Sequence, residues 1–85
     1  MYCIFSFKSR QEAMRFYDTA KKNLIPVMLI STPKFVQLGC GLSVKASVEY
    51  YKNLYSLFVS MKFSSFLGAY KLRQVEKETQ SERIL

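Results

Sequence analysis

The sequence predicts an α+β fold in which two helices cover one face of an antiparallel sheet. Strand and helix patterns follow one another in the order strand, helix, strand, strand, helix, strand, and the 85 residues suffice for one domain. Two β-α-β units in tandem, each with a right-handed crossover, place both helices on the same face. We therefore expect a four-stranded ferredoxin-like split β-α-β sandwich (βαββαβ) over residues 1–75, followed by a polar C-terminal tail at 76–85.

The first strand and the first helix have clear periodicities. Residues 2–8, YCIFSFK, predict a strand with Cys3, Phe5 and Phe7 on one face and Tyr2, Ile4 and Ser6 on the other. Ser9 can cap the following helix, and Glu12 stands where a capping box needs it. Apolar residues then recur at helical spacing: Ala13, Phe16, Tyr17, Ala20 and Leu24. They predict a helix over roughly residues 10–23.

The middle of the chain predicts two short strands with a turn-rich segment between them. Residues 27–30 form a short apolar run that follows a proline and is typical of a buried strand. Thr32 can cap one or two helical turns at residues 33–38, which Gly39 would end. Residues 41–46, GLSVKA, then alternate between apolar and polar positions, which predicts the next strand.

The last third of the chain predicts a helix and a strand. Ser47 is a suitable helix cap, and Glu49 is well placed in the first turn. The apolar stripe of this helix comprises Val48, Tyr51, Leu54, Tyr55, Phe58 and Met61. Residues 65–75 predict a final strand, and we expect residues 76–85 to be frayed or weakly helical.

The composition counts against an autonomous hydrolase. The sequence has no histidine, so Cys-His and Ser-His-Asp catalysis are excluded. Its two cysteines are too few for a disulfide framework or a convincing zinc site. The three glycines form no phosphate-binding loop. We expect a carrier or binding protein without metal or cofactor, in which cysteine is the one obviously reactive side chain.

The charge is strongly positive, with a formal net value of +7. No acidic residue occurs between Asp18 and Glu49 or between Glu49 and Glu76, which indicates either a solvated basic surface or an acidic partner. The N-terminal positive charges follow the apolar run, unlike those of a signal peptide. The longest apolar region, residues 53–70, includes Lys62 and is too polar to cross a bilayer. We expect a cytoplasmic protein with reduced thiols and no membrane contact.

Several short motifs follow one another in a recognisable order. They are Phe7 with Ser9, Ile25-Pro26-Val27, Thr32-Pro33-Lys34, and Cys40-Gly41-Leu42-Ser43-Val44-Lys45. Over roughly residues 2–73 this order resembles the selenium/sulfur carrier-like family of small domains. Family members tend to have serines just before the cysteine, where this chain has Gln37-Leu38-Gly39. The resemblance implies a thiol that accepts sulfur or selenium from a donor of cysteine-desulfurase type and delivers it to an acceptor protein.

Cys40 is the predicted chalcogen-carrying thiol. The expected supporting residues are Gly39, Gly41, Lys34, Lys45 and Thr32. The glycines leave room for a partner's active site, and nearby cations favour the thiolate. A helix ending just before the thiol would disfavour the anion, and a small buried residue in a tight turn is the alternative interpretation. Cys3 alternates with Phe5 and Phe7, so we expect it to pack in the core.

Two other functions remain open. Basic, aromatic sheets of this type bind RNA by stacking bases on an open face, although residues 41–46 contain no aromatic residue and lack the RNA-recognition-motif signature. The third hypothesis is a homodimeric interaction module. Its interface would be the open sheet face, with Tyr2 and Ile4 from the first strand and Gly68, Tyr70 and Leu72 from the last.

Overall fold

The chain folds as an α+β protein with a five-stranded antiparallel sheet and two helices. The computed structural model describes residues 1–36, 41–75 and 78–85. The strands are β1 Tyr2–Phe7, β2 Met28–Ser31, β3 Leu42–Ser47, β4 Phe66–Val75 and β5 Glu78–Arg83, in the sheet order β2-β3-β1-β4-β5. The helices are α1 Arg10–Lys22 and α2 Tyr51–Ser60, and a 3₁₀ turn, η1 Val48–Tyr50, leads into α2.

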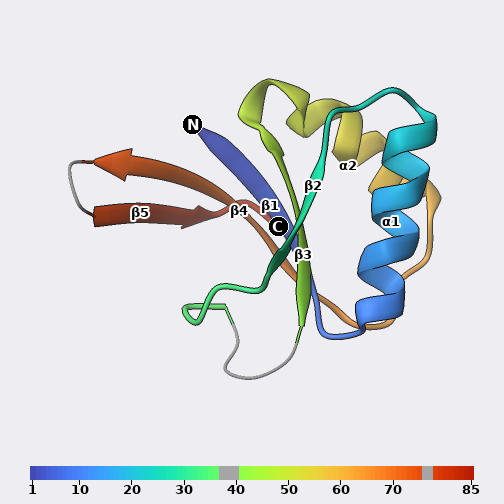
Figure 1. Cartoon of the computed structure of the whole chain (residues 1–85), viewed down its shortest axis with the longest axis horizontal. Helices are drawn as coiled ribbons and strands as arrows, with labels where there is room; N and C mark the ends of the chain where they lie inside the picture. Colours follow the sequence, from blue (N-terminus) through green and yellow to red (C-terminus); the bar gives the residue numbers. More distant parts are fainter. Residues whose placement is uncertain (37–40, 76–77) are drawn as a thin grey trace.

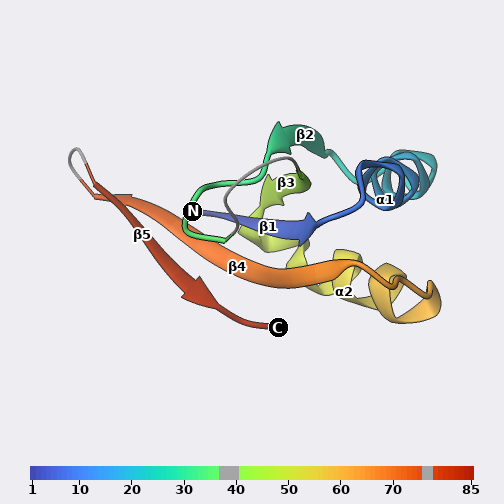
Figure 2. The ribbon, with the colours of Figure 1, turned by 90° about the horizontal axis from the view of Figure 1, so that it is seen from below.

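Both helices lie on the same side of the sheet (Figures 1 and 2). The predicted alternation of β1 is confirmed, because Cys3, Phe5 and Phe7 are fully buried in the core beneath the helices. The helices contribute Ala13, Phe16, Ala20 and Leu54 to this core, and the neighbouring strands contribute Val44, Ala46 and Ala69. We call this side of the sheet the helix-side face and the other side the opposite face.

Aromatic rings fill the space between the helix-side face and the helices. The ring centroid of Phe5 lies 5.2 Å from that of Phe16 and 5.7 Å from that of Phe58. Phe58 in turn lies 4.3 Å from Phe66 of β4. Such pairs add about 0.5–1.5 kcal/mol beyond their area burial. The aromatic residues of α2 that face the sheet therefore belong to the core.

The start of α1 is tied to the loop that follows α2. The Ser9 hydroxyl accepts from the Glu12 backbone N–H at 3.2 Å, which confirms the predicted cap. The second half of the expected capping box is not formed, because the Ser9 N–H donates to the Ser65 hydroxyl at 3.0 Å. The Glu12 carboxylate accepts instead from Ser64 and Ser65. These hydrogen bonds, led by the one from the Ser65 hydroxyl, lower the Glu12 pKa from 4.5 to about 2.

The C-terminal segment corrects the sequence prediction. Residues 78–83 form β5, antiparallel to β4, so the expectations of a frayed or weakly helical tail and of four strands are wrong. β4 has ten residues; one of its edges pairs with β1, and its other edge pairs with β5 over Tyr70–Val75. The resulting hairpin projects away from the helices (Figure 1). β5 reads ETQSER, and this polar composition gives no apolar alternation to predict a strand.

The start of α2 also differs from the prediction. Ser47 stands at the expected cap position, but its side chain makes no capping hydrogen bond, and the chain enters the helix through η1. Leu54 is the fully buried residue of the stripe, whereas Tyr55 is 41% exposed. The stripe therefore faces the core along one side and reaches the protein surface at its edge.

Candidate functional site

The candidate site lies where the chain passes from β2 to β3. Cys40 and Gly39, predicted as the carrier thiol and one of its flanking glycines, lie outside the described residues. The described parts of the connection between β2 and β3 are residues 32–36 on one side and Gly41 with β3 on the other.

Three buried hydroxyl groups lie side by side at the base of this connection. The Ser6 and Ser43 hydroxyl oxygens are 2.7 Å apart, and the Ser43 oxygen is 3.0 Å from that of Thr32. Ser6 and Ser43 are fully buried, and Thr32 is 8% exposed. We call this set the hydroxyl chain. Because buried hydroxyls need partners, it fixes β1, β3 and the end of β2 relative to one another on the opposite face.

The two ends of the connection meet at the hydroxyl chain. The Thr32 N–H donates to the Gly41 carbonyl at 3.2 Å, and Gly41 is buried. The structure thus brings together two of the predicted supporting residues, Thr32 and Gly41. The residue that precedes Gly41 in the sequence is Cys40, so the chain is anchored immediately after the predicted thiol.

The first part of the connection forms a turn. Residues 33–36 are closed by a hydrogen bond from the Val36 N–H to the Pro33 carbonyl at 3.0 Å, and the described part of the segment contains no helix. The expected cap is also absent, because the Thr32 hydroxyl bonds to Ser43 instead. Residues 32–36 therefore form no helix whose C-terminus could disfavour a thiolate at Cys40.

Phe35 lies against the opposite face of the sheet. Its ring meets Tyr70 of β4 edge to face, with centroids 5.6 Å apart, and 51% of Phe35 stays exposed. The Tyr70 ring covers Gly68, where an added Cβ would lie 3.0 Å from the phenol oxygen. Gly68 also has a φ of +151°, which side-chain-bearing residues rarely adopt. A glycine at this position lets Tyr70 lie flat beneath Phe35.

The two predicted lysines occupy different environments. Lys34 is exposed in the turn. Lys45 lies on the opposite face in register with Ile4, and its ammonium stands 4.1 Å from the centroid of the Tyr2 ring. Tyr2 pairs with Ser47, at the end of β3 remote from Gly41. The structure therefore associates the Lys45 charge with Tyr2.

Cys3 is a core residue, as the sequence predicted. It is fully buried, and its sulfur lies 3.9 Å from the Ser47 carbonyl oxygen. Burial raises the pKa of its thiol from 9.0 to about 11, and a backbone hydrogen bond offsets part of this effect. Cys3 is therefore protonated at neutral pH and shielded from reagents.

The contact between Ser6 and Ser43 was not predicted from the sequence. Each alternates with apolar neighbours in its strand, which indicates only that both face away from the helices. Their contact depends on the register in which Ser6 pairs with Ser43. The available signal was a serine at matching positions of two adjacent strands, and the register itself was not predictable from either strand.

Comparison with known families identifies the chain. A family model described as "Putative Se/S carrier protein-like" matches residues 2–64. The chain belongs to this family. The expected resemblance to residue 73 extends beyond the matched region, which ends before β4 begins. Searches of curated proteins and of solved structures found no match.

The described part of the chain lacks two other kinds of functional feature. No group of three or more histidine, cysteine, aspartate or glutamate side chains there is arranged to hold a metal ion. No helix among those residues is long and apolar enough to cross a membrane.

Proposed function

We propose that this protein carries sulfur or selenium on Cys40 and acts as a delivery protein, not as an autonomous enzyme. The observation that carries the proposal is the state of the other thiol. The sequence has two cysteines, and Cys3 is buried with its pKa raised to about 11. A family described as Se/S carrier-like needs one reactive thiol, and Cys40 is the cysteine left to supply it.

The proposed transfer is a thiol exchange. The Cys40 thiolate attacks the terminal sulfur of a donor persulfide, R–S–SH, and a new S–S bond forms as the donor's S–S bond breaks. The donor leaves as the thiolate RS⁻, and the chain holds Cys40–S–SH. An acceptor thiolate then attacks the same terminal sulfur and releases Cys40 as a thiolate. Selenium would follow the same steps in place of the terminal sulfur.

The surroundings of the connection suit this role. Thr32 and Gly41 hold its two ends together through a backbone hydrogen bond, and the hydroxyl chain fixes that base in the sheet. Lys34 is exposed in the same connection and would supply positive potential. Gly39 would leave space for a partner, whereas Gly41 is buried and would anchor the chain just after the thiol. Lys45 would contribute more weakly because its ammonium lies on Tyr2.

The proposal implies partners and a compartment. The donor would be of cysteine-desulfurase type, the acceptor a second protein, and the compartment the reducing cytoplasm. We also infer that β1 to β4 and the two helices form a ferredoxin-like sandwich to which β5 is added. The strand order β2-β3-β1-β4 supports this inference.

The test is the pH dependence of alkylation at each cysteine, measured by peptide mass mapping of the native protein. We expect Cys40 to react with an apparent pKa below about 8.5 and Cys3 to react only after denaturation. Cys3 thus serves as the internal control. If Cys40 is labelled only after denaturation, it is a buried packing residue, and the carrier proposal is wrong.

A second measurement addresses the cargo itself. Incubation with a cysteine desulfurase and free cysteine should add one sulfur atom to the peptide that contains Cys40, and reductant should remove it. The Cys40→Ser variant is the matched control, because it retains Cys3. Loading that persists in this variant would contradict the assignment of Cys40.

A further inference from the structure

The opposite face of the sheet combines aromatic rings with positive charge. Lys45 lies 4.1 Å from the centroid of the Tyr2 ring, and the Arg83 guanidinium carbon lies 5.9 Å from that of Tyr70. Phe35 adds a third ring, in edge-to-face contact with Tyr70. We call these five residues, Tyr2, Phe35, Lys45, Tyr70 and Arg83, the basic aromatic face.

The acidic side chains that the structure describes lie away from this face. The strand register places Lys45, Tyr70 and Arg83 on the opposite face, and it places Glu82 on the helix-side face in register with Lys71. Glu12 and Asp18 belong to α1, and Glu49 belongs to η1. Among the acidic residues whose side chains the structure describes, none lies on the opposite face. Arg83 Nε donates to the Leu85 main-chain oxygen at 3.0 Å. Together with Lys45, Arg83 still gives this face a positive potential, which attracts anions.

The rings of this face are spaced for more than one planar group. Tyr70 pairs with Ile4 and Leu72 pairs with Tyr2, so Tyr2 and Tyr70 occupy diagonal positions on adjacent strands. Diagonal positions lie about 7–8 Å apart. Tyr2 and Tyr70 are partly exposed, and half of Phe35 is exposed. Splayed bases can stack on such rings while cations beside them bind phosphates.

We propose that the basic aromatic face binds single-stranded nucleic acid. Bases would stack on Phe35, Tyr2 and the accessible part of Tyr70, and Lys45 and Arg83 would contact the phosphates. This activity is separate from the thiol chemistry, because none of the five residues supplies a sulfur atom. Duplexes would bind less well, since their bases are already stacked and cannot reach the rings.

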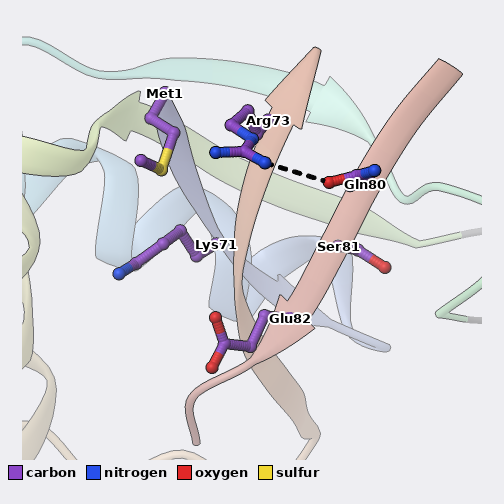
Figure 3. A pocket seen from close by; sticks show the side chains of 6 residues that line it. All are labelled: Met1, Lys71, Arg73, Gln80, Ser81 and Glu82. Atoms are coloured by element: carbon purple, nitrogen blue, oxygen red, sulfur yellow. Dashed lines mark hydrogen bonds between the residues drawn. The ribbon is translucent and has the colours of Figure 1, made fainter. Parts of the chain in front are cut away.

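The helix-side face of the same hairpin provides a matched control. Lys71 and Arg73 there line a hollow of about 400 Å³ together with Gln80 and Glu82 (Figure 3). Arg73 donates to the Gln80 side-chain oxygen at 3.3 Å. Replacing Lys71 and Arg73 removes two positive charges, as does replacing Lys45 and Arg83, but on the other face of the sheet.

The experiment measures the fluorescence anisotropy of labelled oligonucleotides of about 12 nucleotides, single-stranded RNA and DNA of one sequence and the corresponding duplex. We expect the chain to bind the single strands more tightly than the duplex. K45Q/R83Q should weaken binding at least about tenfold and reduce the salt slope by about 1.4, because two phosphate contacts are lost. K71Q/R73Q should change the affinity much less. Tighter binding of either RNA or DNA would show which of the two nucleic acids is the ligand.

The contribution of the aromatic rings to nucleic-acid binding is tested with a separate pair of variants. Phe35→Ala should weaken binding about fivefold or more by removing a stacking surface, whereas Tyr55→Ala, which removes an exposed ring of α2, should not. The comparison of Phe35→Ala with Tyr55→Ala also tests nucleic-acid binding by the basic aromatic face if K45Q/R83Q fails to fold. Absence of binding in low salt, or equal losses in both charge variants, would overturn the proposal. So would self-association that K45Q/R83Q abolishes, since the face would then be an interface between two copies.

Discussion

The two faces of the central strand β1 differ in how they use the same kind of residue. On the helix-side face, Phe5 and Phe7 are fully buried among other rings. On the opposite face, Tyr2 is partly exposed beneath Lys45, and Ser6 joins the hydroxyl chain. Aromatic content alone therefore says little about function. The face on which a ring lies decides whether it stabilises the core or remains accessible to a ligand.

The contrast extends to what holds each face together. The helix-side face relies on apolar contacts between rings, and the hydrophobic effect that stabilises them is non-directional. The opposite face relies at its centre on hydrogen bonds between Ser6, Ser43 and Thr32, which require a fixed register. Loss of one polar member leaves its partners buried and unsatisfied. Three experiments test this difference, beginning with the largest expected effect.

The largest effect should follow Phe5→Ala. The Phe5 ring contacts Phe16, Phe58, Phe66 and Tyr51 and has no exposed surface. Its removal should lower the free energy of unfolding by about 3–5 kcal/mol, measured by urea denaturation. Phe35→Ala is the control, because Phe35 is half exposed, and its loss should cost well under about 1 kcal/mol. Similar losses in the two variants would mean that both faces contribute equally to the core.

A smaller loss should follow Ser43→Ala. Ser43 is the middle member of the hydroxyl chain, so this change leaves the Ser6 and Thr32 hydroxyls buried without their shared partner. We expect a destabilisation of about 1–3 kcal/mol in the same denaturation assay. Ser60→Ala is matched in chemistry but lies at the surface, where its hydroxyl bonds to the Leu57 carbonyl, and should cost less than about 0.5 kcal/mol. A neutral Ser43→Ala would show that the chain of hydroxyls is not a structural support.

Much of the fold was predictable because its signals are local. The alternation of β1, the Ser9 cap and the helix over roughly residues 10–23 depend on neighbouring residues, and the structure bears them out. β5 was not predicted because it pairs only with β4 and its other edge faces water, so its residues can be polar throughout. An edge strand of this kind has no apolar alternation in its sequence. It forms because the edge of β4 that is not paired with β1 is available for hydrogen bonding.

The candidate site was predictable only in part. Thr32 and Gly41 were identified from short motifs, and the structure brings them together. Ser6 and Ser43 lie 37 residues apart in sequence, and their contact arises from strand register, which depends on the packing of the whole sheet. The cap expected of Thr32 was wrong for a related reason. A buried hydroxyl from another strand was a better partner than the backbone of a short turn.

The last and smallest effect concerns acid. Glu12, in the helix layer, has a carboxyl pKa of about 2, below its ordinary 4.5, because Ser65 and Ser64 donate hydrogen bonds to it. A lowered pKa means that the ionised form stabilises the fold above about pH 5 and that this contribution is lost as the pH falls towards 2.

We therefore expect the protection factors of the Ser64 and Ser65 amides, which correct for the pH dependence of intrinsic exchange, to fall over that pH range before those of Ser6 and Ser43 do. The Glu12→Gln variant should lose this acid dependence of exchange at Ser64 and Ser65, whereas the Glu49→Gln variant should retain it. None of the five residues of the basic aromatic face has a carboxylate side chain, so binding of nucleic acid there should not follow the Glu12 transition. Parallel acid sensitivity of the two faces would show that Glu12 controls the whole fold and that the faces are not independent.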